Sequence, residues 1–190
     1  MWKKKKSGFP GGIHPTDGYD KAMTMHLPVR EYWPETVTIL AEQSFGGKCS
    51  LLVKPGDKVT AGSQIGKPEA FMAAPLHASV SGEVLEVKEV CQQNRMVLGC
   101  IVKREGEMER KPQAYESEMV SPEKYSREEI LAGVRDGGLT GMGGAGFPTH
   151  KKYETDKPID SLLINGAECE PFLTCDYRLM LEQGYGILNG

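Results

Sequence analysis

A glycine-rich stretch at residues 137–149 constrains the fold of this chain more than any other feature of its sequence. Six of these thirteen residues are glycine, and Phe147 and Pro148 follow the last glycine. Because glycine lacks a Cβ, such a run suits a loop that needs positive φ or that lets a ligand approach its amides. Pro148 fits the first turn of a helix, whose free N–H groups favour phosphates and electron-rich rings. The stretch predicts a nucleotide-binding loop.

Two familiar glycine motifs and a linker are the alternatives for this stretch. Gly141, Gly143 and Gly146 spell GxGxxG, but a helix-like segment precedes them where the dinucleotide motif follows a strand. The Gly-Lys-Ser/Thr ending of a P-loop is absent. Flexible linkers are Gly/Ser-rich without a bulky apolar residue, so Phe147 argues against that interpretation.

Composition excludes several classes of function. The 190 residues carry a net charge of −3 and a pI near 5.9, which argues against nucleic acid as a partner. The basic cluster Lys3–Lys6 is a solvated tail or a point of attraction to an anionic membrane or acidic partner. The sequence shows neither a membrane span nor a signal peptide, so we expect a cytoplasmic protein. The five cysteines form no CxxC pair, and no metal site is predicted.

The chain divides into four predicted parts. Residues 1–36 are broken by prolines and glycines and should form an extended arm. Residues 37–104 form an all-β unit, 105–125 a polar linker, and 126–190 the first portion of an α/β domain. The strands expected in the β unit are Val37–Leu40, Ser50–Val53, Val84–Lys88 and Met96–Val102, separated by turns at Pro55–Asp57, Ala61–Ser63 and Ser81–Glu83.

The β unit resembles the barrel-sandwich hybrid fold of biotinyl and lipoyl carrier domains. The resemblance rests on three runs, residues 53–59, 61–66 and 74–84. In those carriers a lysine at a hairpin tip takes the cofactor. Here the only lysine of the hairpin between Ile65 and Pro75 is Lys67, at its base. We therefore expect a non-carrier module that docks on its neighbours, and we expect His77 to pack or to form a hydrogen bond near the second turn.

The last part should alternate helices with a buried strand. Ser126–Glu129 is a capping box, and the helix that it starts should end at Gly137–Gly138. A short helix at Thr149–Tyr153, a parallel strand at Ser161–Asn165 and a last helix capped by Thr174 should follow. The polar run 165–171 would then lie beyond a strand's carboxyl end, where open α/β sheets bind ligands.

Together these stretches resemble the N-terminal part of the RnfC subunit of the Rnf electron-transport complex. Gly11–Pro15, the barrel, the glycine-rich stretch and residues 165–171 carry the resemblance, which covers nearly the whole chain. The glycine-rich stretch and residues 165–171 also resemble the corresponding segments of the flavin-binding subunit of respiratory complex I, where FMN and NADH lie against them. That pattern has Asp where this chain has Ala167. The cofactor-binding residues implied by the resemblance are Gly141, Gly143, Gly144, Ala145, Gly146, Phe147, Lys152, Asn165, Glu168 and Glu170.

The resemblance implies an electron-transfer subunit of a membrane-associated ferredoxin:NAD oxidoreductase, with a barrel-sandwich hybrid domain before a Rossmann-like α/β flavin domain. Hydride would pass between NADH and FMN, and single electrons through [4Fe–4S] clusters beyond Gly190, so we expect an N-terminal fragment that is inactive alone. Its partners would be other membrane-complex subunits, which hold it at the cytoplasmic face of the membrane, and ferredoxin or a flavoprotein. The alternatives are a soluble relative serving a dedicated reductase and a non-catalytic docking subunit.

Overall fold

The computed structural model describes residues 21–30, 32–106, 121–142 and 144–190. The chain divides into two units. One holds the described residues up to Arg30 together with Leu163–Gly190, and the other runs from Glu31 to Leu162. The predicted boundaries at residues 36, 104 and 125 stay predictions.

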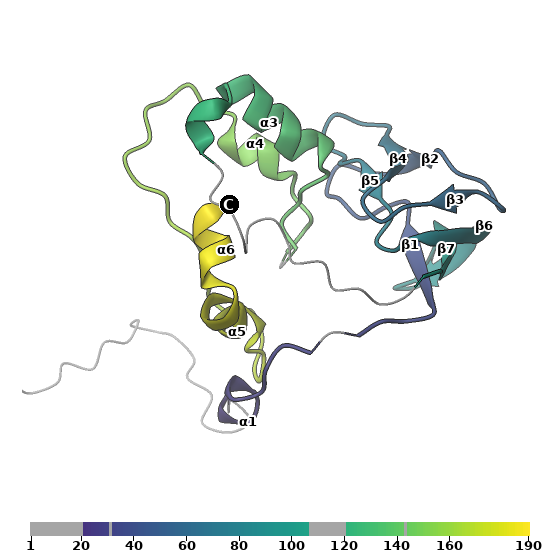
Figure 1. Ribbon diagram of the computed structural model, residues 1–190, viewed down its shortest axis with the longest axis horizontal. Helices are drawn as coiled ribbons and strands as arrows, with labels where there is room; N and C mark the ends of the chain where they lie inside the picture. Colours follow the sequence, from purple (N-terminus) through teal and green to yellow (C-terminus); the bar gives the residue numbers. More distant parts are fainter. Residues whose placement is uncertain (1–20, 31, 107–120, 143) are drawn as a thin grey trace, which may run out of the picture. The chain divides into compact units, whose positions relative to one another are not determined.

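Two antiparallel sheets form the β part of the second unit (Figure 1). One has the strand order β1-β7-β6-β3 and the other β2-β4-β5. The strands are β1 Thr36–Leu40, β2 Cys49–Leu51, β3 Lys58–Val59, β4 Gln64–Pro68, β5 Leu76–His77, β6 Gly82–Gln92 and β7 Arg95–Arg104. The four predicted strands correspond to β1, β2, β6 and β7. Sequence reasoning missed β3, β4 and β5, which are short or contain glycine and proline.

The hairpin of β6 and β7 is the longest element of this unit. Its two-residue turn consists of Gln93 and Asn94, whose φ angles are 47° and 65°. Two-residue hairpin turns whose twist matches that of the strands need positive φ at both positions. Cross-strand pairing runs from Gly82 opposite Arg104 to Gln92 opposite Arg95, with an irregularity between Val84 and Glu86. Gln92 therefore lies at the far end of the hairpin from the core.

The core lies between the two sheets. Ile65, Val84, Val102 and Cys100 are fully buried, and residues of both sheets surround them. Burying each Val or Ile side chain contributes about 1.5–3 kcal/mol, so this cluster supplies the unit with its own stable core. The turns behave as predicted: Gly56 and Gly62 have φ of 90° and 86°, and Asp57 accepts a hydrogen bond from the Lys54 amide at 2.9 Å.

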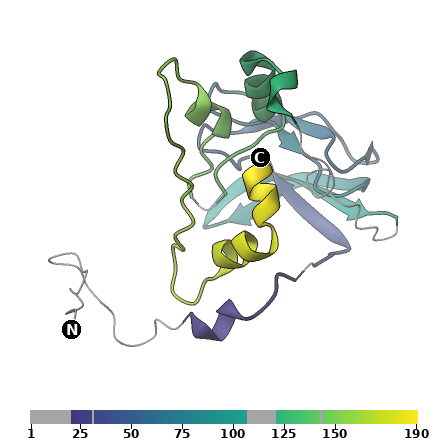
Figure 2. The ribbon, with the colours of Figure 1, turned by 60° about the vertical axis from the view of Figure 1, so that its left-hand side comes forward.

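Helices α3 (Arg127–Asp136) and α4 (Thr149–Tyr153) flank the glycine-rich stretch and lie side by side (Figure 1, Figure 2). A short 3-10 turn at Pro122–Lys124 precedes them. The capping box is confirmed: the Ser126 hydroxyl accepts from the Glu129 amide, and the Glu129 carboxylate accepts from the Ser126 amide. Gly137 caps α3 and Gly138 has φ of 69°, so the helix ends where predicted.

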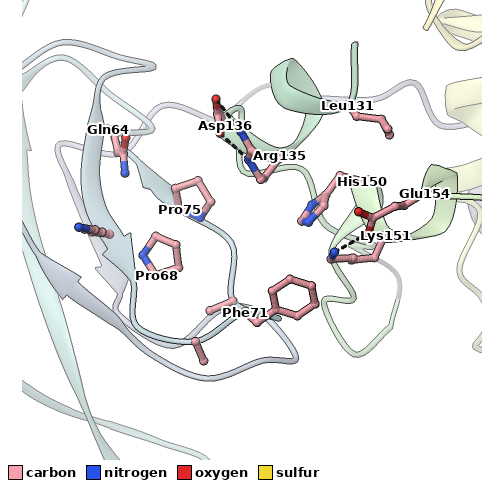
Figure 3. Close-up of a pocket in the computed structure, with 13 residues that line it drawn as sticks. Gln64, Pro68, Phe71, Pro75, Leu131, Arg135, Asp136, His150, Lys151 and Glu154 are labelled. Carbon is pink, nitrogen blue, oxygen red and sulfur yellow. Dashed lines mark hydrogen bonds and ion pairs between the residues drawn. The ribbon is translucent and has the colours of Figure 1, made fainter. Parts of the chain in front are cut away.

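A cavity of about 490 Å³ separates α3 and α4 from the loop between β4 and β5 (Figure 3). The Lys151 ammonium lies 3.8 Å from the centre of the Phe71 ring and pairs with Glu154. Arg135 pairs with the adjacent Asp136 at 2.9 Å, and His150 is buried beside them. This loop is where carrier domains present their lysine. Here the loop contacts α4 through Phe71, and the absence of a carried cofactor stays a prediction.

The other unit contains α1 (Ala22–Met25), α5 (Cys175–Glu182) and α6 (Gly184–Asn189). Two predictions are wrong. The described end of the N-terminal arm contains one helical turn, α1, where no glycine or proline interrupts residues 21–27. Residues 161–165 form no strand, because no described segment pairs with them, and Leu162, Leu163 and Ile164 are 68%, 94% and 62% exposed. Helix α6 was not predicted. No described helix is long and apolar enough to cross a membrane.

Two glycines of the second unit should respond oppositely to alanine. A Cβ on Gly82 would lie 1.9 Å from the Lys103 carbonyl oxygen, so Gly82→Ala should destabilise the fold by about 1–3 kcal/mol. Gly133→Ala is the matched control. Nothing lies within 4 Å of its Cβ position inside α3, so it should stabilise by roughly 0.5–1 kcal/mol. Urea unfolding of both variants measures these effects. A wild-type unfolding midpoint for Gly82→Ala would contradict the close approach of β7 to Gly82.

The buried histidine makes a second prediction. Burial, and then the neighbouring Lys151 charge, lower the pKa of His150 below its ordinary value. The folded state therefore disfavours the protonated form. The stability that this contributes is present above about pH 6.5, the ordinary pKa, and should be lost as the pH falls below it and through the lowered pKa of the folded state. Unfolding free energy measured between about pH 5 and 7.5 should fall less in His150→Gln than in wild type. The exposed His26 gives the control variant His26→Gln. An unchanged pH slope in His150→Gln would refute the assignment.

Candidate functional site

The glycine loop, residues 137–149, is a closed hairpin-like loop. Thr140 and Pro148 form an isolated antiparallel bridge at its base. Within it the Gly141 amide donates to the Phe147 carbonyl at 3.0 Å, and the Thr149 amide donates to the Leu139 carbonyl at 2.9 Å. Pro148 precedes α4 as its N-cap residue, one position earlier than a first-turn proline. This is the geometry of an ordered loop, and the linker interpretation is wrong.

The barrel contacts the glycine loop on both sides of its tip, at Gly138 and at Gly146. We call these two positions the first and second shoulder of the loop. A Cβ on Gly138 would lie 2.4 Å from the Pro75 carbonyl oxygen, and one on Gly146 would lie 2.7 Å from that of Gln43. Both glycines have positive φ, 69° and 68°. These two glycines are therefore required by contact with the barrel. His77 lies against the same shoulder, 3.1 Å from the Gly138 Cβ position, so it packs near the glycine loop.

Two further contacts fix the second shoulder. The Phe45 amide donates to the Gly146 carbonyl at 3.0 Å. The rings of Phe45 and Phe147 lie 6.0 Å apart at an interplanar angle of 44°, a favourable tilted arrangement. Sequence reasoning placed Phe147 at the cofactor, and it missed Phe45 altogether, since no motif marks a residue whose role is to meet a distant loop.

Gly144 and Gly141, farther from the barrel contacts, are less crowded. No atom of the described residues lies within 4 Å of a Cβ built on Gly144, which is exposed. A Cβ on Gly141 would lie 3.4 Å from the Lys152 ammonium, which has no hydrogen-bond or ion-pair partner in the described part of the chain. The loop thus has a barrel-contacting side and a side that is free to meet a ligand. Gly143 lies outside the described residues.

A groove of about 560 Å³ runs between the glycine loop and the barrel edge. Its loop side includes Gly141, Gly144 and Ala145, and its barrel side includes Gln92 and Arg95. The Gln92 Oε1 atom is buried and has no hydrogen-bond partner among the described residues, and Arg95 pairs with Glu42 at 3.2 Å. The groove has the size of a ligand pocket, and it holds a buried acceptor in need of a donor. The sequence shows Gln92 only as part of a polar hairpin turn.

The acidic loop, residues 165–171, lies in the other unit. The Asn165 side chain accepts from the Ala167 amide at 3.0 Å, so it shapes its own turn. Glu168 accepts from the Tyr177 amide at 3.0 Å and from the Cys175 thiol at 3.6 Å. Thr174 occupies the predicted N-cap position but makes no side-chain cap, because Glu168 takes that role. Desolvation, followed by the charges of Glu168 and Asp176, raises the pKa of Cys175, which keeps it a thiol donor.

The predicted site residues therefore fall into two groups. Glu170 differs from its neighbours: its side chain is exposed and has no partner among the described residues. Asn165, Glu168 and Glu170 come together on the acidic loop. The described glycine-loop residues and Lys152 come together in the other unit. The assignment of all of them to a cofactor stays a prediction.

Comparison with known proteins gives matches to two families. Residues 7–107 match the RnfC barrel sandwich hybrid domain, and residues 134–190 match the Nuo51 FMN-binding domain. The second match begins near the end of α3, and it includes the whole glycine loop and the whole acidic loop. Gly11–Pro15, which carried part of the resemblance, lies outside the described residues.

Relatives with similar sequences are C subunits of oxidoreductase complexes. That of the Na⁺-translocating ferredoxin:NAD⁺ oxidoreductase complex of Acetobacterium woodii is 36% identical over 98% of this chain. That of the proton-translocating ferredoxin:NAD⁺ oxidoreductase complex of Clostridium ljungdahlii is 36% identical over 96%. That of the ion-translocating oxidoreductase complex of Vibrio cholerae is 33% identical over 96%. The chain spans less than half of these relatives, since the alignments cover 42%, 40% and 24% of their lengths.

The barrel match covers more than half of the chain, and the relatives match it almost from end to end. The predicted fold class is confirmed by the two matched families and by the strand-rich barrel unit. The chain belongs to the RnfC family of oxidoreductase complex subunits, with a barrel-sandwich hybrid domain followed by the start of an FMN-binding domain.

Proposed function

We propose that this chain supplies the FMN- and NADH-binding surface of the electron-transfer subunit of a ferredoxin:NAD oxidoreductase. The observation that carries the proposal is the glycine loop, which the barrel fixes at Gly138 and Gly146 while Gly144 faces open space. The match to an FMN-binding domain and the similarity to ferredoxin:NAD⁺ oxidoreductase subunits support it. Other subunits of a membrane complex, and ferredoxin or a flavoprotein, would be its partners, so the protein would be peripheral on the cytoplasmic face of the membrane.

The residues of the groove fit a flavin. The open Gly144 face admits a flat ring or a phosphate to within contact of bare backbone, and the buried Gln92 oxygen can accept from an imide or amide N–H. Lys152, beside Gly141 and without a partner in the described residues, can offset phosphate charge. FMN, when bound, accepts a hydride and passes its two electrons on singly, which links NADH to [4Fe–4S] clusters.

The acidic loop is assigned to the dinucleotide. Glu170 has an exposed carboxylate with no partner among the described residues, and carboxylates accept from ribose hydroxyls and carboxamides. Asn165 already accepts from the Ala167 amide within the loop, and Glu168 accepts from the Tyr177 amide of α5, so these two side chains shape the loop for Glu170. Hydride transfer needs the nicotinamide held in one orientation, and this is what a carboxylate fixed on a shaped loop contributes.

Two substitutions in the full-length protein separate flavin from NADH. Gly144→Val should lose bound flavin and NADH oxidation together, because its side chain fills ligand space. It should leave unfolding within about 0.5 kcal/mol, because no protein atom lies near that Cβ. Glu170→Gln should keep flavin and raise the NADH KM roughly 10- to 100-fold, the value of a charge-assisted hydrogen bond. The measurements are the flavin content and the rate of NADH-dependent viologen reduction of both variants and of the wild type. Wild-type flavin and kinetics in Gly144→Val would mean that the loop is not the flavin surface.

A further inference from the structure

The segment Lys21–Val29 binds the turn Glu170–Leu173, which forms the end of the acidic loop and the two residues after it. The Lys21 ammonium donates to the carbonyl oxygens of Glu170, at 3.1 Å, and Leu173, at 2.6 Å. The Thr24 hydroxyl donates to the carbonyl of Phe172. Three carbonyls of one four-residue turn therefore accept from two side chains that lie about 150 residues earlier in the chain.

This turn needs external support. Phe172 has φ of 63°, in the left-handed region that a bulky side chain rarely adopts. Such a conformation persists only when its surroundings over-determine it. Lys21 and Thr24 support the turn by donating hydrogen bonds to its carbonyl oxygens. The bonds from the Lys21 ammonium are charge-assisted, and the one to Leu173 is short at 2.6 Å.

A second attachment holds the same segment to helix α5. The Val29 amide donates to both oxygens of the Glu182 carboxylate, at 3.2 and 3.3 Å. Arg178 pairs with Glu182 and donates to the Met25 carbonyl at 3.3 Å. The segment is thus bonded at both ends, to the turn by Lys21 and Thr24 and to α5 through Val29 and Met25. It lies within the region that matches the barrel family, yet it packs in the unit of the acidic loop.

We propose that Lys21 and Thr24 are positioning residues that fix the acidic loop and thereby set how Glu170 meets NADH. This inference rests on the proposed role of Glu170. Lys21 holds the backbone carbonyl of Glu170 itself, so loss of the bond would release the residue whose carboxylate faces the dinucleotide. Lys21 and Thr24 touch no reacting atom. Their effect on NADH must pass through the loop.

The test uses the full-length protein with its flavin. Lys21→Met keeps the aliphatic stem and removes the donor, and Thr24→Val removes the hydroxyl at equal size. Each should raise the NADH KM about 10-fold while kcat with saturating NADH and the flavin content stay unchanged. Lys54→Met, at an exposed lysine of a barrel turn, is the control for lost charge and should leave the KM unchanged. Lys21→Arg should restore most of the wild-type KM.

Two further measurements distinguish positioning from other causes. Cleavage after Glu168 by a glutamate-specific protease, without NADH, should be faster in Lys21→Met than in Lys54→Met. In a Glu170→Gln background, Lys21→Met should raise the KM no further, because both changes act on one contact. Equal effects in both backgrounds, or an unchanged KM and cleavage rate, would overturn the inference. If Glu170→Gln itself left the KM unchanged, the proposed function of the loop would fail instead.

Discussion

Contact between the glycine loop and the barrel is the constraint on which the site depends. Gly138 and Gly146 have left-handed backbones and lie so close to the Pro75 and Gln43 carbonyls that no side chain could replace the hydrogen. The Phe45 amide then binds the Gly146 carbonyl. A loop of six glycines would be costly to order by itself, since glycine loses the most backbone freedom on folding. The barrel offsets that cost by holding the loop at Gly138 and Gly146, while Met142, Gly144 and Ala145 between them are exposed.

The barrel loop between β4 and β5 contacts a helix in this chain. In the carrier domains that the barrel resembles, a lysine at a hairpin tip takes the cofactor. In this chain the loop carries Phe71, whose ring meets the Lys151 ammonium of α4 across the cavity beside His150 (Figure 3). This part of the barrel therefore lies against a helix beside the glycine loop, and that it carries no cofactor stays a prediction. A rigid scaffold for a binding loop is the common feature of such sites.

The sequence predicted those parts of the fold that depend on interactions between residues close together in the chain. The capping box at Ser126, the glycine stop at Gly138 and the turn at Gly56 each follow from residues within a few positions, and the structure has all three. The buried strand at residues 161–165 failed because an apolar run becomes a strand only with a partner, and no described segment supplies one. The acidic loop shows the same limit. Thr174 has the right position for a cap, but Glu168, brought back by the turn between them, accepts from the helix instead. The bonds from Lys21 and Thr24 span about 150 residues, and no sequence signal marks them.

Amide hydrogen exchange on the full-length protein, compared with and without bound FMN, tests the central claim most directly. If the barrel holds the glycine loop as a flavin surface, peptides covering residues 139–146 and the hairpin end at Gln92–Arg95 should gain protection when FMN binds. The core strand β7 around Val102, already fully buried, should not change. Slow exchange that FMN leaves unaltered in the loop and the hairpin end, with protection confined to other parts of the protein, would contradict the account.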